Sequence, residues 1–349
     1  MSADLKLGLN TGYWGAGPPH GAQESIAAAD ELGYDSIWTA EAYGSDALSP
    51  LAWWGAATKN VRLGTAIMQM SARQPAATAM AAMTMDHLSG GRFILGIGVS
   101  GPQVVEGWYG TPFEKPLART REYIRIVRDV FARDAPVTSE GPYYPLPLIE
   151  GEGVSGLGRA LKSTIHPVRE DIPIFLAAEG PKNIALSAEI ADGWNALFYS
   201  PYHDDFYRSA LAEGFAREGA RRSAADFEVV ATAPVIVHDD VEAAADMLRP
   251  MYALYFGGMG ARGANFHHNV PVRMGYADEA KLCQDLYLDG KKDEAAAALP
   301  TRLVEELALI GSEDKIRGEL DAWRDSAVTT LLVGGDAATV RRVAEVVLG

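Results

Sequence analysis

Short apolar runs alternate with longer segments of helical period along most of this chain, and no other feature of the sequence limits its fold as strongly. Such alternation is typical of βα units repeated around a parallel sheet. Several runs are apolar at consecutive positions, Phe93-Ile94-Leu95 among them, as expected for strands buried on both faces. The pattern predicts eight strands, at 5–10, 36–40, 61–69, 93–99, 172–178, 193–199, 227–238 and 329–334.

Eight βα units predict an α/β fold of the (β/α)8 TIM-barrel type. The length of 349 residues exceeds that of most domains, but such barrels reach this size when their loops carry insertions. We therefore expect one domain over 1–349. Two stretches rich in glycine, proline and aromatic residues break the rhythm, at about 135–171 and 256–300, and are expected to be irregular insertions in the barrel loops.

Charge and cysteine content exclude several classes of function. The net charge of -15 disfavours nucleic acid or an anionic membrane as a partner. Cys283 is the only cysteine, which rules out an intrachain disulfide and a thiolate zinc cluster and suits a reducing cytosol. The sequence shows neither a signal peptide nor a run of about 18 apolar residues. We expect a cytoplasmic protein that acts on a small molecule.

The strongest local signal for a binding site lies at 178–182, where a buried strand ends in Ala178, Glu179 and Gly180 and a helix begins at Pro181. The start of a helix binds phosphate through free N–H groups and the positive end of the helix dipole. Proline has no N–H, so the donors would come from its neighbours, and the Lys182 ammonium would add charge. An ordinary βα turn has the same pattern, and the residues alone leave both interpretations open.

Two further strand ends carry candidate residues. Gly98, Ser100 and Gly101 close the strand at 93–99, where a hydroxyl and a close backbone approach become available, although the spacing is not that of a dinucleotide-binding loop. Glu41 and Tyr43 follow the second strand and are expected to face the barrel mouth, where barrel chemistry gathers. For Glu41, general acid or base catalysis, helix capping and ion pairing all remain open.

No metal site is predicted. His267 and His268 are adjacent, and no histidine or carboxylate at helical spacing accompanies them. With Arg262 and Arg273 they lie in the second insertion, where they are candidates either for substrate contacts or for surface ion pairs. A Gly-x-Ser-x-Gly elbow is absent from the sequence, which removes the commonest serine nucleophile.

An ordered set of motifs covers nearly the whole chain and resembles the luciferase-like monooxygenase superfamily. Within it, the sequence is similar to actinobacterial oxidoreductases that depend on coenzyme F420. Each motif is short, but their order is specific. The motifs are WTAEAYGSD at 38–46, LGTAIM at 63–68, LSGGRF at 88–93, GIG at 96–98, AAEGP at 177–181, ADGW at 191–194 and GSEDKI at 311–316.

The resemblance implies a deazaflavin ring lying across the carboxyl-terminal mouth of the barrel, with the coenzyme phosphate on the turn at 179–182. It also implies a non-proline cis peptide in the third strand, at Ala66-Ile67, whose bulge backs the ring. Relatives commonly form homodimers, and we expect the same here. The implied coenzyme-binding residues are Ala66, Ile67, Met68, Gly98, Ser100, Gly101, Ala178, Glu179, Gly180, Pro181 and Lys182.

The sequence departs from relatives that oxidise alcohols or sugar phosphates. Those carry an acid-histidine pair after the second strand and a glutamate after the fourth, whereas Glu41-Ala42 and Gly101 stand here. Without the histidine, Glu41 and Tyr43 are the candidate proton donors. The function expected is a coenzyme F420-dependent oxidoreductase that transfers a hydride between the deazaflavin C5 and a small organic substrate. A monooxygenase dependent on reduced FMN and a coenzyme-binding protein without turnover are the alternatives.

Overall fold

The computed structural model describes residues 5–12 and 14–349. Its main sheet is a closed parallel barrel in the order β3-β2-β1-β11-β8-β7-β6-β5-β4, closed by a further pairing of β3 with β5. The predicted (β/α)8 barrel is therefore confirmed. Its strands are β1 (Lys6–Asn10), β2 (Ser36–Thr39), β3 (Arg62–Thr65), β4 (Met68–Gln69), β5 (Phe93–Gly98), β6 (Ile174–Ala177), β7 (Gly193–Ala196), β8 (Glu228–Thr232) and β11 (Thr330–Val333).

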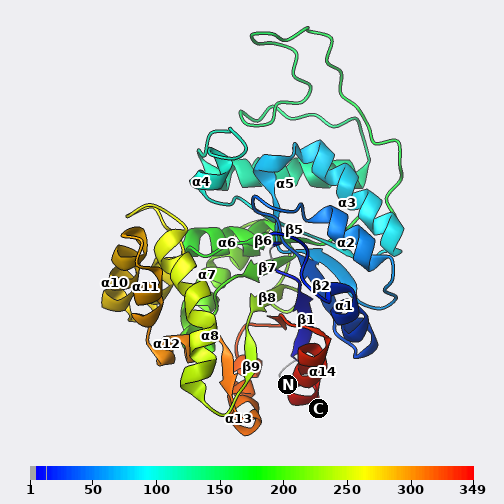
Figure 1. Cartoon of the computed structure of the whole chain (residues 1–349). Coiled ribbons are helices and arrows are strands. Elements are labelled where there is room, and N and C mark those ends of the chain that lie inside the picture. Colours follow the sequence, from blue (N-terminus) through cyan, green and yellow to red (C-terminus); the bar gives the residue numbers. More distant parts are fainter. Residues whose placement is uncertain (1–4, 13) are drawn as a thin grey trace.

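Helices surround this barrel (Figure 1). Four of them begin with proline, where the missing N–H costs no hydrogen bond, and Gly90 ends α3 in the left-handed conformation. No helix in the described ranges is long and apolar enough to cross a membrane. The helices are α1 (Ala22–Glu31), α2 (Leu48–Gly55), α3 (Pro75–Ser89), α4 (Pro102–Val105), α5 (Pro116–Ala132), α6 (Pro181–Ile190), α7 (Asp204–Phe215), α8 (Val241–Ala253), α9 (Asn269–Arg273), α10 (Ala277–Leu288), α11 (Lys292–Ala297), α12 (Thr301–Leu307), α13 (Glu313–Asp325) and α14 (Ala337–Val347).

Two predicted strands are broken in the structure. The strand expected at 61–69 is divided into β3 and β4 at Ala66-Ile67, where the peptide bond is cis, as the resemblance implied. The strand expected at 227–238 ends at Thr232, because Pro234 cannot donate to a ladder. The chain resumes as β9 (Val235–Val237), which pairs with β10 (Leu309–Gly311) in a separate two-stranded sheet that was not predicted.

The two predicted insertions differ in structure. Between α5 and β6 the chain forms a long arm that reaches away from the barrel (Figure 1) and contains a single β-bridge, from Ser139 to Leu146, as its irregular composition indicated. The second insertion was expected to be irregular, and that expectation is wrong: it contains a π-helical turn, Leu254–Gly258, and helices α9 to α11. The prediction gave too much weight to the glycines at 257–263. It overlooked strong helix formers later in the same insertion, such as those of Lys292–Ala297.

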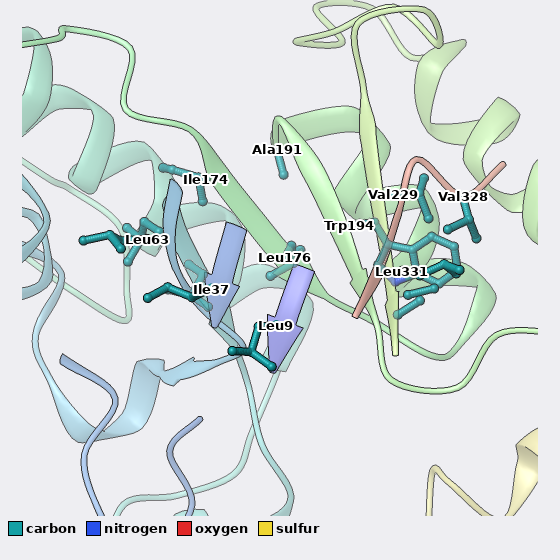
Figure 2. Close-up of a cluster of buried hydrophobic side chains, with 14 of the residues drawn as sticks. Leu9, Ile37, Leu63, Ile174, Leu176, Ala191, Trp194, Val229, Val328 and Leu331 are labelled. Carbon is teal, nitrogen blue, oxygen red and sulfur yellow. The ribbon is translucent and has the colours of Figure 1, made fainter. Parts of the chain in front are cut away.

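Side chains fill the barrel interior, so it is a packed core rather than a pore. Trp38 and Phe175 are fully buried there, with ring centroids 5.9 Å apart. Gly64 makes room for the indole, because a Cβ atom at that position would lie 2.4 Å from Trp38 Cε3. Alternate residues of the same strands, including Leu63 and Leu176, point outward into a second apolar layer beneath the helices (Figure 2).

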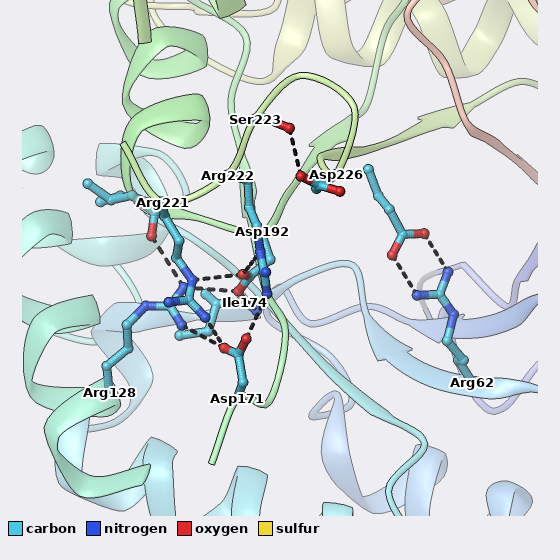
Figure 3. A network of polar contacts seen from close by, with 11 residues as sticks. Arg62, Arg128, Asp171, Ile174, Asp192, Arg221, Arg222, Ser223 and Asp226 are labelled. Carbon is cyan, nitrogen blue, oxygen red and sulfur yellow. Dashed lines mark hydrogen bonds and ion pairs between the residues drawn. The ribbon is translucent and has the colours of Figure 1, made fainter. Parts of the chain in front are cut away.

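The amino-terminal end of the barrel is closed by ion pairs. Arg62, at the start of β3 and labelled in Figure 3, donates two 2.7 Å hydrogen bonds to the carboxylate of Glu228, at the start of β8. Arg62 also pairs with Asp35. The Lys6 ammonium lies 3.6 Å from both carboxylates. The opposite, carboxyl-terminal mouth is therefore the open end, as in other barrels of this kind.

A second network joins the starts of β6 and β7 to α5 and to the loop between α7 and β8 (Figure 3). Asp192 is buried, and its carboxylate accepts hydrogen bonds of 2.7 to 2.9 Å from the backbone N–H of Ile174 and from the guanidinium groups of Arg128, Arg221 and Arg222. The Asp171 carboxylate pairs with the same three arginines but is half exposed.

Candidate active site

The carboxyl ends of β2, β4 and β5 bring several predicted residues together. The backbone N–H of Glu41 donates to the carbonyl of Ile67 over 3.1 Å, and the N–H of Gln69 donates to Glu41 Oε2 over 2.9 Å. Met68 and Gln69 lie in register with Ile97 and Gly98 of β5. Residues distant in the sequence thus form one wall of the barrel mouth.

Ala66, Ile67 and Gly98 lie next to one another in this wall, and we call these three residues the flat patch. A Cβ atom at Gly98 would lie 2.9 Å from Ile67 Cδ1 and 3.3 Å from the Cβ of Ala177, so glycine keeps the backbone of β5 close to both neighbours. Ala66 N donates to the carbonyl of Thr39, which ties the patch to β2. Met68 was predicted to bind coenzyme, but its side chain is buried in the core, so it can support the patch only from below.

Ser100 and Gly101 lie immediately beyond β5, where the chain turns into α4. Ser100 adopts a left-handed conformation with φ of 58°, and Gly101 precedes the first residue of the helix with φ of -116°. Both residues are partly exposed at the mouth. They follow Gly98 of the flat patch by two and three residues.

Glu41 is buried and forms an ion pair. Its Oε2 atom accepts from Arg73 Nη1 over 2.8 Å and from the backbone N–H of Gln69. Burial by itself lowers the pKa of the Arg73 guanidinium, but the hydrogen bond and charge of Glu41 raise it above its ordinary value. Of the roles left open by the sequence, ion pairing is the one that the structure shows.

The two candidate phenols at the mouth differ in environment. Tyr43, predicted from the sequence, is 61% exposed. Tyr109 was not predicted: it follows α4 and its hydroxyl donates to the carbonyl of Ala42 over 3.3 Å. The amide of Gln69 donates to the same carbonyl over 2.9 Å. The aromatic pair Trp108-Tyr109 in a loop after a barrel strand was the only sequence signal for this residue, and it was weak.

The turn at 178–182 stands at the same end of the barrel. The carbonyl of Ala178 accepts from the indole N–H of Trp194 over 2.8 Å, which fixes the turn against β7. Helix α6 begins at Pro181 after Gly180, and within the described chain no side chain caps this helix start. Lys182 is exposed beside it. The turn thus offers backbone donors and the exposed ammonium of Lys182, which suits an anion.

Glu179 directs its side chain toward the second insertion. Its Oε1 atom lies 2.7 Å from His267 Nδ1, and its carbonyl accepts from Arg273 Nη2 over 3.2 Å. Arg262, in contrast, pairs at the surface with Asp285. Two of the insertion residues singled out in the sequence therefore reach the predicted phosphate turn. Among residues 5–12 and 14–349, no group of three or more histidine, cysteine or carboxylate side chains is arranged to hold a metal.

Several buried polar atoms near the mouth lack a hydrogen-bond partner within the part of the chain that the structure describes. They are both side-chain amide atoms of Asn195 and the atoms Gln69 Oε1, Ser71 Oγ, Glu179 Oε2 and Asn183 Oδ1. Buried polar groups are normally partnered, so these atoms leave hydrogen-bonding capacity that a ligand could complete. With the flat patch and the backbone donors of the turn at 178–182, they are compatible with a planar ring that has polar edges and an anionic tail.

Comparisons with known proteins agree with this geometry. The sequence profile of the family described as luciferase-like monooxygenase matches residues 6–330. A Mycobacterium tuberculosis protein named "Putative coenzyme F420-dependent oxidoreductase Rv3520c" is 57% identical over 348 residues, which cover 99% of this chain and 100% of that protein.

Two solved structures share the fold across almost their whole length. The coenzyme F420-dependent tetrahydromethanopterin reductase of Methanopyrus kandleri superposes with a TM-score of 0.80 at 21% identity, covering 99% of each chain. An F420-dependent secondary alcohol dehydrogenase, solved with an F420-acetone adduct, gives a TM-score of 0.76 at 18% identity and covers 99% of this chain and 98% of that one. By its sequence and its barrel, the chain belongs to the luciferase-like monooxygenase family.

Proposed function

We propose that this chain is a coenzyme F420-dependent oxidoreductase that transfers a hydride between the deazaflavin C5 and a small organic substrate. The observation that carries the choice of coenzyme is the 57% identity to the mycobacterial protein over essentially the whole chain. The flat patch and the turn at 178–182 support it, because a tricyclic ring and a phosphate need these two surfaces at one end of the barrel.

The residues that would hold the coenzyme form two groups. Ala66, Ile67 and Gly98 would face the ring, with Ser100 and Gly101 at its border and Met68 beneath. Ala178, Glu179, Gly180, Pro181 and Lys182 would receive the phosphate. When bound, coenzyme F420 supplies a hydride donor or acceptor at C5, and the chain supplies alignment, exclusion of water and a proton.

The domain organisation, cellular location and oligomeric state are also proposals. A single domain is supported by the match of one family profile to residues 6–330. Action in the cytoplasm is supported by the one cysteine, Cys283, which is buried and unpaired. A homodimer is supported only by the resemblance to the family.

Titration of the purified protein with coenzyme F420 and with FMN, followed by coenzyme fluorescence, tests the choice of coenzyme. We expect saturable binding of F420 and no comparable response to FMN. Tight FMN binding without a response to F420 would contradict the proposal and favour a monooxygenase dependent on reduced FMN. Binding of reduced F420 without its consumption, against a panel of carbonyl, enone and imine compounds, would favour a coenzyme-binding protein without turnover.

Replacing Lys182 with alanine is expected to weaken F420 binding about two- to five-fold, which is the range for one exposed charge pair. The difference from wild type should shrink as salt is added, because exposed charges are screened. Lys59→Ala is the matched control, since Lys59 is equally exposed but precedes β3 at the closed end of the barrel. Equal affinities for the two variants would remove Lys182 from the phosphate site.

A further inference from the structure

Reduction of a carbonyl, enone or imine by hydride leaves the substrate with a negative charge, so a proton must reach it from a group at the barrel mouth. Neither of the groups expected from the sequence suits this task. The Oε2 atom of Glu41 is already engaged by Arg73 and by the backbone N–H of Gln69. Tyr43 is 61% exposed, so its hydroxyl offers no advantage over a water molecule.

Tyr109 is placed differently. It belongs to the loop after β5, yet its hydroxyl crosses to the loop after β2 and lies 3.3 Å from the carbonyl of Ala42. The preceding residue, Glu41, bonds through its N–H to the carbonyl of Ile67 in the flat patch. The loop after β2 therefore links the phenol to the flat patch. The hydrogen bond of the hydroxyl is long, and Gln69 already donates to the same carbonyl, so the hydroxyl is weakly tied to this acceptor.

The charges around Tyr109 favour a donor that is protonated at neutral pH. Burial raises the pKa of its hydroxyl above the ordinary value, the Glu41 carboxylate raises this pKa further, and the Arg73 guanidinium opposes both. Asp46 acts on the same arginine by its charge. The hydroxyl thus keeps its proton until a base forms nearby, and Arg73 can then stabilise the phenolate.

We propose that Tyr109 is the proton donor of the reductive reaction and that Glu41 positions Arg73 beside it, a role that rests on the hydride transfer proposed above. Reduced coenzyme F420, when bound, would supply the hydride, two electrons and a proton, to the substrate carbon and would itself be oxidised. The electron pair of the substrate double bond moves to its terminal atom, which takes the proton from the Tyr109 oxygen. The phenolate left behind regains a proton from solvent.

Tyr109→Phe tests this role, because it keeps the ring and removes only the hydroxyl. Loss of a positioned general acid should lower kcat about 100-fold or more, while the Kd for F420 measured by fluorescence stays within about two-fold of wild type. Trp108→Phe is the control for disturbance of the loop, since the neighbouring indole is 65% exposed. In wild type, kcat should fall as pH rises through the pKa of the donor, and this limb should disappear in Tyr109→Phe.

A second measurement needs no coenzyme. Ultraviolet difference titration of wild type against Tyr109→Phe reports the ionisation of this tyrosine alone. We expect it to ionise above the ordinary tyrosine pKa, at higher pH still in Arg73→Met and at lower pH in Glu41→Gln. Ionisation at the ordinary pKa, unmoved by either change, would overturn the assigned surroundings of Tyr109.

The two proposals fail in different ways. A wild-type protein that does not bind F420 overturns the proposed function, and the proton donor with it. A wild-type protein that binds and consumes reduced F420, accompanied by an equally active Tyr109→Phe, overturns only the assignment of the donor.

Discussion

Replacing Asp192 with alanine is expected to lower the free energy of unfolding by about 3 to 5 kcal/mol, the range for removing one partner from a buried ion pair. The carboxylate is 4% exposed and accepts from three arginines and from the backbone N–H of Ile174. Without it, the guanidinium groups of Arg128, Arg221 and Arg222 would repel one another around an unpaired N–H. The half-exposed Asp171 could offset only part of this charge.

Denaturant unfolding followed by circular dichroism measures this loss. Asp171→Ala is the matched control, because Asp171 contacts the same three arginines from a half-exposed position, where an ion pair contributes about 1 kcal/mol or less. Asp192→Asn, which keeps one acceptor oxygen, should fall between the two. Equal stabilities of Asp192→Ala and Asp171→Ala would show that burial of the carboxylate does not govern the network.

Gly96→Ala is expected to destabilise the barrel by about 3 kcal/mol or more, or to prevent its folding, because the added methyl group meets backbone. A Cβ atom at Gly96 would lie 1.7 Å from the carbonyl oxygen of Thr65 and 2.8 Å from Asn195 Nδ2. The Thr65 hydroxyl also donates to the Gly96 carbonyl and accepts from its N–H. Strands β3 and β5 would have to separate where their pairing closes the barrel.

The comparison for this change is Gly318→Ala. Gly318 lies within α13, and a Cβ atom there would have no neighbour within 4 Å. Alanine is favoured over glycine inside helices by about 1 kcal/mol, so this variant should match or exceed wild type in stability. The midpoints of thermal and denaturant unfolding, measured for both variants and for wild type, test this expectation. A folded Gly96→Ala with wild-type midpoints would contradict the close approach of the strands.

The strand pattern was readable in the sequence wherever a strand is buried on both faces. Runs such as Phe93-Ile94-Leu95 are apolar at every position, whereas an amphipathic surface helix would include polar residues at helical spacing. The errors arose where a strand was extended past a residue that ends it, and where a strand was too short to show a pattern. Pro234 marked the end of β8 and was passed over, and the three residues of β10 are too few to show a period.

The site was predictable in its backbone and not in its side-chain partners. Strand ends and helix starts follow from local residues, so the wall at Gly98 and the turn at Gly180 could be located in advance. Partners come from anywhere in the chain. Glu41 meets Arg73 across 32 positions, Tyr109 meets Ala42 across 67, and His267 meets Glu179 across 88. One sequence carries no record of such pairings, which is why Glu41 was taken as a possible acid and Tyr109 was missed.

The ion pairs of Arg62 lie at the amino-terminal end of the barrel, and side chains around Trp38 fill its interior, so coenzyme and substrate would both enter from the carboxyl-terminal mouth. The coenzyme and the substrate would therefore use the same entrance, and one of them would lie behind the other. Whichever occupies the deeper position has to bind first and depart last, so the steady-state kinetics should follow a compulsory order. The deazaflavin ring, bound against Ile67 and Gly98, would bind first. Excess substrate would then slow turnover, because it would bind before the oxidised coenzyme had left and would block its release.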